Sequence, residues 1–331
     1  AVLFDWAGTM IDFGSRAPVM AMEQVFEKAG VPADETTIRR YMGMAKREHV
    51  VSTLSEDAMA ARWQAAKGSA WSEADVDALM VDLEPAMATS AALCRELIPG
   101  AATTASALKH KGIKVGSTTG YTRTMMADII PAAADQGYAP AAIVCAGETA
   151  LGRPAPLMLW QAMAELSAWP AGRCVAVDDA PVGIVAGRNA GLWTIGVAGS
   201  GNGVGMTYDD FMALAVEERA ERMAPVVDEF AAAGADFVVE SVADLCLAIR
   251  AIEEALTKGD QPGAAATRML GSTTIPATVT AIMITEITTT AARDSCPWSR
   301  LPKTCLAALT VWQWTGLRCP SAPAFPVCRE D

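Results

Sequence analysis

The stretch "RCVAVDDAPVGIVAGRNAGLWTIGVAG", residues 173–199, decides the fold class. Residues 173–180 and 192–199 are short apolar runs of the kind that form buried strands. Residues 182–191 lie between them, carry apolar side chains at helical spacing and end on a glycine, as helices commonly do. Two strands joined through a helix by short loops predict a parallel pair, because parallel strands need such a crossover.

The same alternation of strand and helix continues upstream. Strands are predicted at residues 2–5, 113–120 and 141–147, and helices at residues 101–112, 122–137 and 155–168. Repeated units of this kind build a doubly wound parallel sheet, in which ligands bind at the carboxyl ends of the strands. The sequence therefore predicts an α/β fold with a Rossmann-like sheet, which the strand at residues 2–5 must join.

A long helical block interrupts the alternation after the first strand. Its apolar residues recur at steps of three and four and break at Gly, Pro or Ser, which predicts helices at residues 17–30, 35–55, 56–68 and 73–97. We interpret residues 15–98 as an inserted α-helical cap domain. The core domain would then consist of residues 1–14 and 99–260, with the cap covering its site.

Residues 261–331 differ in character from the rest of the chain. They are rich in proline and lack helical periodicity, so we expect a disordered or mistranslated extension, with a small genuine module as the alternative. Four of the eight cysteines crowd into this segment: Cys296, Cys305, Cys319 and Cys328. A zinc site is disfavoured there because the segment has no histidine and the cysteine spacings are irregular.

Composition narrows the class of function. The chain has 331 residues, 52% of them apolar, and a formal net charge of −12, which indicates a soluble globular protein and argues against nucleic-acid or anionic-membrane partners. Glu286 and many threonines interrupt the only long apolar run, so no membrane span is expected. No signal peptide is recognised, so the cytoplasm is expected, and the start within a strand suggests that a few residues normally precede Ala1.

The motif "FDWAGTMID", residues 4–12, carries the first chemical signal. Asp5 ends the first strand, and Gly8 permits a tight turn after it, so the carboxylate would project into the crevice at the strand's end. Such an acid serves as a nucleophile toward phosphorus or as a metal ligand. The plainer alternative is an aspartate that only caps a turn.

Three further strand ends carry matching groups. Thr119 and the amide of Gly120 would bind a phosphoryl oxygen, and Arg153 stands before a Pro-started helix, where its guanidinium would hold phosphate unless it is only a surface cation. Asp178 and Asp179 end a buried strand and would repel each other unless a cation lies nearby. A magnesium site shared with Asp5 is the economical interpretation.

Together these residues resemble the haloacid dehalogenase superfamily, and the resemblance extends to its phosphonoacetaldehyde hydrolase family. It rests on "FDWAGTMIDFGSRAP", "RRYMGMAKREHV", "STTGYTR", "GRPAP" and "GRNAGLWTIGV", and spans residue 1 to about residue 259. Ala7 stands where phosphatases of the superfamily have a second acid for an oxygen leaving group. The family cleaves a carbon–phosphorus bond instead, and the departing carbanion needs an electron sink.

The resemblance implies that Lys46 supplies this sink as an imine with the aldehyde, while Asp5 attacks phosphorus. Without the resemblance, Lys46 would be read as a solvated lysine. Met42 and His49 would share its helical face, and His49 would relay protons. The residues expected to bind substrate are Thr119, Gly120, Tyr121, Arg153, Met42 and Ser15. Mg²⁺ would be held by Asp5, the Ala7 carbonyl, Asp179 and Asp178.

Two positions depart from the family pattern: Ser15 stands where some members have cysteine, and Gly183 where some have an acid. The family implies a small-molecule phosphonate substrate, a place in 2-aminoethylphosphonate degradation, and homodimers formed through the cap. The alternatives are a phosphate-ester phosphatase or phosphomutase of the same fold, and an inactive binding protein. "GSGNGVG", residues 199–205, invites a dinucleotide-binding interpretation, but it does not fit GxGxxG and is expected to be a mobile loop.

Overall fold

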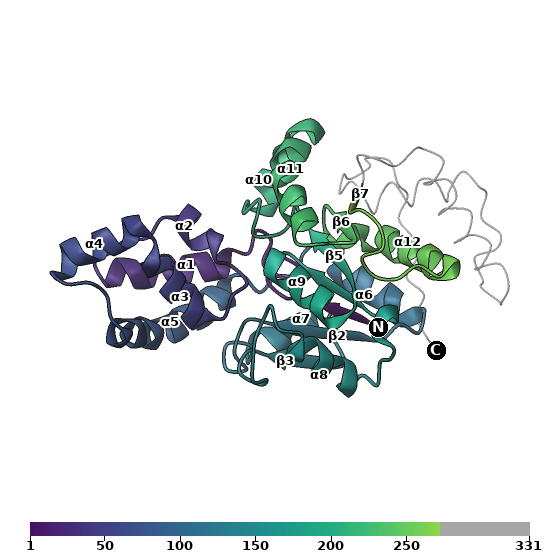
Figure 1. Cartoon of the computed structure of the whole chain (residues 1–331), viewed down its shortest axis with the longest axis horizontal. Helices are drawn as coiled ribbons and strands as arrows, with labels where there is room; N and C mark the ends of the chain where they lie inside the picture. Colours follow the sequence, from purple (N-terminus) through teal and green to yellow (C-terminus); the bar gives the residue numbers. More distant parts are fainter. Residues whose placement is uncertain (272–331) are drawn as a thin grey trace, which may run out of the picture. The chain divides into compact units, whose positions relative to one another are not determined.

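The computed structural model describes residues 1–271 and contains a seven-stranded parallel sheet with the order β3-β2-β1-β4-β5-β6-β7 (Figure 1). The strands are β1 Val2–Phe4, β2 Val115–Thr119, β3 Ala142–Cys145, β4 Val175–Asp178, β5 Trp193–Val197, β6 Phe237–Val239 and β7 Arg268–Leu270. In the centre, β1 pairs with both β2 and β4, so that Val2 is level with Val115 and Val175. The predicted fold class, including the place of the first strand in the sheet, is confirmed.

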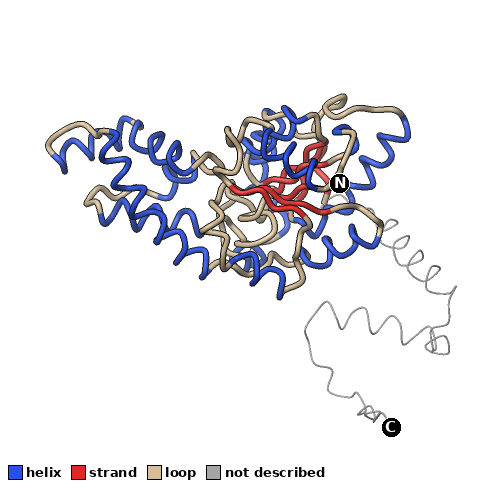
Figure 2. Tube along the Cα trace, turned by 90° about the horizontal axis from the view of Figure 1, so that it is seen from below, coloured by secondary structure: helices blue, strands red, loops and turns tan. Residues whose placement is uncertain are grey.

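Helices cover both faces of the sheet (Figure 2). They are α6 Ala101–His110, α7 Ile129–Asp135, α8 Leu157–Glu165, α9 Pro181–Ala190, α10 Tyr208–Ala213, α11 Val216–Ala232 and α12 Leu245–Lys258, with short 3₁₀ turns at Ala171–Arg173 and Val242–Asp244. Strand side chains alternate between the two layers, as the period of two requires. Val2 and Phe4 pack with α6 and α12 on one face, while Leu3 packs with α8 and α9 on the other. The sheet is thereby buried on both sides.

Five helices lie in the chain between β1 and α6, and we call them the helical insert: α1 Arg16–Lys28, α2 Glu35–Arg40, α3 Lys46–Ser55, α4 Asp57–Lys67 and α5 Glu73–Leu93. Figure 1 shows them grouped together, in purple and blue. Met22 and Phe26 of α1 and Leu83 and Met87 of α5 are buried inside the insert, in an apolar cluster that continues to the sheet. Among the described residues, no helix is long and apolar enough to span a membrane.

Three predicted boundaries differ from the structure. The helix expected over residues 35–55 is broken at Tyr41–Ala45, because Gly43 adopts φ +86° there and lies against Val182. The helix expected over residues 122–137 is helical only at Ile129–Asp135. The core does not end at residue 260, because β7 pairs with β6 through Phe237 and Arg268. The four tail cysteines and the expected disorder lie outside the described residues.

Candidate active site

A small cavity of about 30 Å³ lies where the helical insert meets the carboxyl ends of β1 and β2. Two predicted site residues, His49 and Asp178, do not line it. The others do: Asp5, Ala7, Ser15, Met42, Lys46, Thr119, Gly120, Tyr121, Arg153 and Asp179. The sequence did not single out Pro18, Gly43 and Met44, which complete the wall. Residues from both parts of the chain therefore enclose one site, whose volume is about that of one water molecule.

Asp5 stands directly after β1 and is held by backbone hydrogen bonds. Its amide donates to the Val177 carbonyl of β4 over 2.9 Å, which keeps the residue in line with the sheet. The following turn closes on Trp6, whose carbonyl accepts the amide protons of Met10 and Ile11 at 2.8 and 3.0 Å. Gly8 has φ +77°, a conformation that L side chains rarely adopt. The sequence motif thus presents the Asp5 carboxylate at the strand's end.

Arg153 joins two of the buried acids. Its Nη2 lies 2.6 Å from Asp5 Oδ1, and its Nη1 lies 3.2 Å from Asp178 Oδ2. The same Nη2 donates to the carbonyl and hydroxyl oxygens of Thr118, at 3.2 and 3.0 Å. The guanidinium is therefore not a surface cation. The sequence pointed to Thr119, and the neighbouring Thr118 is an arginine partner that it missed.

Three carboxylates form the cluster that suits a metal ion. Oxygen atoms of Asp5, Asp178 and Asp179 lie within 4.8 Å of one another, and all three residues are buried. Burial raises the pKa of Asp178 to about 7, and burial with the neighbouring Asp5 and Asp178 charges raises that of Asp179 well above its usual range. Hard oxygen donors that repel one another in this way fit Mg²⁺, which would relieve the repulsion.

Asp179 is held by two loop segments. Its Oδ2 accepts the amide proton of Asn202 at 2.8 Å. On the other side, a Cβ placed on Gly8 would lie 2.1 Å from the same oxygen, so glycine is required for this approach. Asn202 was not predicted as a site residue. The signal that pointed to it was the glycine-rich segment 199–205, which contacts the site and does not have the dinucleotide pattern.

Lys46 is the first residue of α3 and forms part of the cavity wall. Its side chain is buried, and Nζ lies 5.6 Å from the centroid of the Tyr121 ring. Burial lowers the pKa of Lys46 to about 8, although the Asp5 carboxylate opposes this shift. The Tyr121 hydroxyl is buried without a hydrogen-bond partner. A lysine in this setting carries a substantial fraction of neutral amine near neutral pH, which makes it nucleophilic toward an aldehyde.

His49 lies one turn after Lys46 on α3 and is fully buried. Its Nε2 lies 2.8 Å from the Ile38 carbonyl oxygen, so this nitrogen carries the proton, and Nδ1 has no hydrogen-bond partner among residues 1–271. Burial and the nearby Lys46 charge lower the pKa of His49 to about 3. The imidazole is therefore neutral, and its proposed role as a proton relay stays a prediction. Met42 reaches the cavity from the turn before α3 and not from the helical face of Lys46.

Ser15 and Asp12 form the junction between the site loop and α1. Ser15 precedes the helix in a left-handed conformation, at φ 49°, and makes no side-chain cap. Asp12 caps the helix in its place, because its carboxylate accepts the amide protons of Arg16 and Ala17 at 3.0 and 2.8 Å. Burial raises the pKa of Asp12 to about 6. No sequence pattern singles out Asp12, since the cap depends on its positive φ of 56°.

The site therefore combines three chemical functions within one enclosed volume. Asp5 offers a carboxylate nucleophile, Arg153 a forked cation for an anionic oxygen group, and Lys46 an amine of lowered pKa. Ala7 places no proton donor beside the nucleophile, because its side chain is a methyl group. These groups suit phosphoryl transfer assisted by a covalent bond to an amine.

Comparison with known proteins leads to the same family. The model of the haloacid dehalogenase-like hydrolases matches residues 1–191. The phosphonoacetaldehyde hydrolase of Paraburkholderia xenovorans is 45% identical over 262 residues, which are 79% of this chain and 98% of that protein. The enzyme of the same name from Nitratidesulfovibrio vulgaris is 39% identical over 79% of this chain and 94% of its own length.

A solved structure agrees. The crystal structure of a phosphonoacetaldehyde hydrolase-like protein from Oleispira antarctica is 38% identical, covers 79% of this chain and 95% of its own, and superposes with a TM-score of 0.78. The match to that structure extends over nearly its whole length. The chain thus belongs to the haloacid dehalogenase-like hydrolases and, within them, to the phosphonoacetaldehyde hydrolase family.

Proposed function

We propose that this protein hydrolyses the carbon–phosphorus bond of phosphonoacetaldehyde, yielding acetaldehyde and phosphate, in 2-aminoethylphosphonate degradation. The observation that carries the proposal is the presence of Lys46 and Asp5 in the wall of one cavity, with Ala7 in place of a second acid. A phosphatase needs a proton for its oxygen leaving group, and no side chain at position 7 can donate one. A carbon leaving group needs an electron sink, and Lys46 can form it.

Lys46 acts first in the proposed reaction. Its neutral amine condenses with the aldehyde and releases water, and the resulting imine is protonated on nitrogen. The iminium withdraws electrons from the carbon that bears phosphorus. When the bond to phosphorus breaks, its electron pair enters the carbon–nitrogen system as an enamine. Protonation of the enamine and addition of water then release acetaldehyde and restore Lys46.

Asp5 receives the phosphoryl group. Its carboxylate attacks phosphorus from the end of β1, and water later hydrolyses the aspartyl phosphate. Arg153, already 2.6 Å from Asp5, would hold a phosphonate oxygen in line with the nucleophile, and Thr119 would bind another. Asp178 accepts the amide proton of Ala180 at 3.0 Å, which keeps it beside Arg153. These residues position the reacting groups and require no further proton donor at phosphorus.

Mg²⁺ is the proposed metal. Asp5, Asp179 and the Ala7 carbonyl would hold it, with Asp178 nearby, and it would neutralise charge between the carboxylate and the phosphonate oxygens. The support is the donor chemistry of the cluster: within residues 1–271, Arg153 is the one cation that forms ion pairs with these three buried carboxylates, and it reaches two of them. Without a cation, one anion would have to attack another.

The experiment that tests the proposal measures acetaldehyde release from phosphonoacetaldehyde in the presence of Mg²⁺. Wild-type protein should release acetaldehyde, whereas Lys46→Arg and a chelated sample should not. Hydrolysis of phosphate esters that persists in Lys46→Arg, together with no acetaldehyde from the wild type, would instead place the protein among phosphatases. No reaction on either substrate would favour a binding protein.

We also propose a homodimer formed through the helical insert, in the reducing environment of the cytoplasm. Two apolar side chains on α5 support the dimer, since Val81 and Leu93 are 74% and 69% exposed. The described cysteines, Cys94, Cys145, Cys174 and Cys246, are free thiols, which suits a reducing compartment. Sedimentation analysis of the wild type beside Val81→Lys tests the dimer, because a charge on that face should yield monomers.

A further inference from the structure

The glycine-rich segment 199–205 has no place in the reaction proposed above, yet it lies against the site. It follows β5, and the Ser200 hydroxyl, which is fully buried, donates to the Gly8 carbonyl at 2.8 Å. The Ser200 carbonyl accepts the amide proton of Gly14 at 2.8 Å. The segment therefore contacts both the turn after Asp5 and the linker that leads into the helical insert.

Two of its glycines make room for specific side chains. A Cβ on Gly201 would lie 2.7 Å from the Cβ of Asp179, and a Cβ on Gly205 would lie 2.7 Å from the guanidinium carbon of Arg39. Gly205 also has φ +67°. The segment is thus shaped so that an acid of the core and an arginine of the insert approach it from opposite ends.

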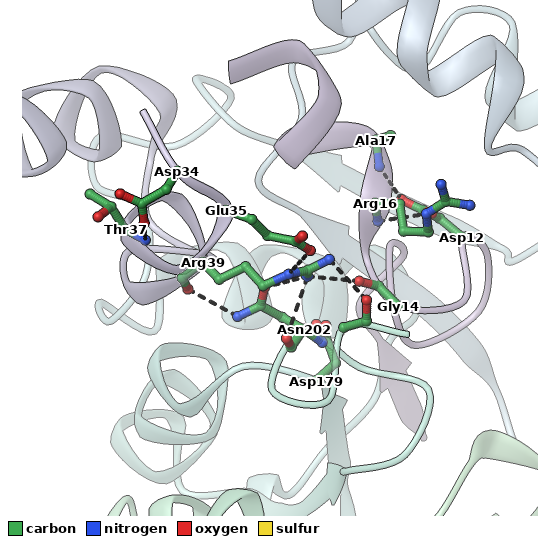
Figure 3. A network of polar contacts seen from close by, with 11 residues as sticks. Asp12, Gly14, Arg16, Ala17, Asp34, Glu35, Thr37, Arg39, Asp179 and Asn202 are labelled. Carbon is green, nitrogen blue, oxygen red and sulfur yellow. Dashed lines mark hydrogen bonds and ion pairs between the residues drawn. The ribbon is translucent and has the colours of Figure 1, made fainter. Parts of the chain in front are cut away.

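Arg39 of α2 fills this position through several hydrogen bonds (Figure 3). Its Nη1 donates to the Gly14 carbonyl at 2.8 Å and to the Asn202 side-chain oxygen at 3.0 Å, and its Nη2 donates to the Gly205 carbonyl at 3.2 Å. Nε pairs with Glu35 at 2.7 Å. The Arg39 side chain is 14% exposed, so these contacts are largely shielded from water.

Asn202 connects Arg39 with Asp179. Its side-chain amide donates to the Arg39 carbonyl at 3.0 Å, and its backbone amide donates to Asp179 Oδ2 at 2.8 Å (Figure 3). One residue of the core loop thus contacts an arginine of the insert on one side and a carboxylate of the proposed metal cluster on the other. Any shift of α2 away from the core must break or move these bonds.

We propose that Arg39 is a positioning residue that couples the seating of the helical insert on the core to the orientation of the Asp179 carboxylate. The proposal rests on the metal-binding role of Asp179 proposed above. The cavity has a volume of about 30 Å³ and is lined by residues of both the insert and the core, so the way the insert sits on the core shapes the site. When the insert is seated on the core, Arg39 and Asn202 hold the Asp179 carboxylate in the orientation that it needs to bind the cation.

The test is the dissociation constant of Mg²⁺, measured by calorimetric titration of the full chain without substrate. The variants are Arg39→Gln and, as matched control, Arg40→Gln. Arg40 is the adjacent arginine, and its ion pair in the described part of the chain is with Glu56 of the insert region. Loss of a partner that orients a metal ligand typically lowers the affinity for the metal 10- to 100-fold. We therefore expect about a tenfold increase in the dissociation constant of Mg²⁺ for Arg39→Gln. Arg40→Gln should bind Mg²⁺ as the wild type does.

Asn202→Ala provides a second route, because it removes the side-chain bonds to Arg39 and keeps the backbone amide that faces Asp179. It should lower the affinity for Mg²⁺ to a similar degree. The double variant should bind Mg²⁺ no more weakly than either single variant. This variant also carries the test if Arg39→Gln does not fold. Wild-type affinity in the folded variants, or equal loss in Arg40→Gln, would overturn the coupling. Absence of Mg²⁺ binding in the wild type would instead overturn the proposed metal site itself.

Discussion

Arg153 Nη2 lies 2.6 Å from Asp5 Oδ1, so the proposed nucleophile and the cation expected to bind the phosphonate are in contact before substrate arrives. Nη1 of the same guanidinium reaches Asp178 at 3.2 Å. Both terminal nitrogens of the guanidinium are thus paired. The side chains of Arg153 and Asp5 are each only 7% exposed. A lysine could supply the charge of Arg153, but it lacks the planar fork whose donors lie on two separate nitrogens.

We therefore predict that Arg153→Lys lowers kcat/KM for phosphonoacetaldehyde by about 100-fold, which corresponds to roughly 3 kcal/mol of lost transition-state stabilisation. The matched control is Arg123→Lys, since Arg123 also makes a forked contact, with both oxygens of Glu148 at 2.7 Å, but at an exposed position. Acetaldehyde release measured over a range of substrate concentrations gives kcat/KM for the wild type and for each variant. Equal kcat/KM in Arg153→Lys and wild type would contradict the role assigned to the fork.

The buried position of Lys46 predicts a pH dependence. Imine formation needs the neutral amine, whose fraction increases as the pH rises through the pKa of Lys46, which burial lowers to about 8. The initial rate of borohydride trapping with acetaldehyde should therefore rise between pH 7 and pH 9, with a midpoint near 8. Peptide mass analysis locates the adduct, and Lys46→Arg serves as the unlabelled control. A midpoint near 10.5, the usual value for lysine, would show that burial does not tune this amine.

The residues at strand ends could be predicted from the sequence for a physical reason. In a parallel sheet the carboxyl ends of all strands meet at one edge, so Asp5, Thr119 and Asp179 had to come together once the strands were recognised. Arg153 stands in a loop at the same edge. These residues line one cavity together with Lys46 from the insert, and their roles stay predictions.

The parts that escaped prediction depend on contacts that have no local pattern. The break before α3 arises where Gly43 meets Val182, and helical periodicity carries no information on that contact. β6 and β7 have three residues each, which is too short for alternation to be seen. Asn202 contacts Asp179 through its backbone amide, a group that every residue except proline has. Its importance is visible only when the loop is folded against Asp179.

Asp12 leads to a prediction about stability. Replacement by alanine removes the cap on the amides of Arg16 and Ala17 and places alanine at φ 56°, so Asp12→Ala should lower the free energy of unfolding by about 2 kcal/mol. Asp12→Asn keeps a side-chain oxygen and tolerates the left-handed conformation, so it should cost less. Urea unfolding at constant pH compares the two variants, and a larger loss for asparagine would contradict the capping role.

The same residue has a defined pH signature. Burial raises the pKa of Asp12 from 3.8 to about 6, so the folded protein binds its proton more tightly than the unfolded chain does. The stabilisation from this proton is present below pH 3.8 and is lost as the pH rises through 6. The unfolding free energy of the wild type should therefore fall relative to that of Asp12→Asn between pH 5 and pH 7. A constant difference in unfolding free energy between the two proteins across this range would show that the pKa of Asp12 is not raised in the folded state.

Gly8 and Gly30 offer a matched pair for the metal cluster. They have almost the same backbone conformation, at φ +77° and φ +74°, so alanine costs about 1 kcal/mol of backbone strain at either position. A Cβ at position 30 would meet nothing within 4 Å, whereas one at position 8 would lie 2.1 Å from Asp179 Oδ2. Gly8→Ala must therefore displace the Asp179 carboxylate or the turn after Asp5, and Gly30→Ala need displace nothing.

The two variants should therefore share the loss of stability from backbone strain, to which Gly8→Ala adds the cost of the displacement, and they should differ in function. We expect Gly30→Ala to retain wild-type acetaldehyde release, and Gly8→Ala to lose at least about tenfold in Mg²⁺ affinity and in kcat, as a displaced ligand would cause. Thermal unfolding of both proteins establishes that the folded fraction is equal before activity is compared. If Gly8→Ala were folded and fully active, the contact between the turn and Asp179 would have no bearing on the reaction. If both variants lost activity to the same extent, the cause would be backbone strain, and displacement of the Asp179 carboxylate would not explain the loss.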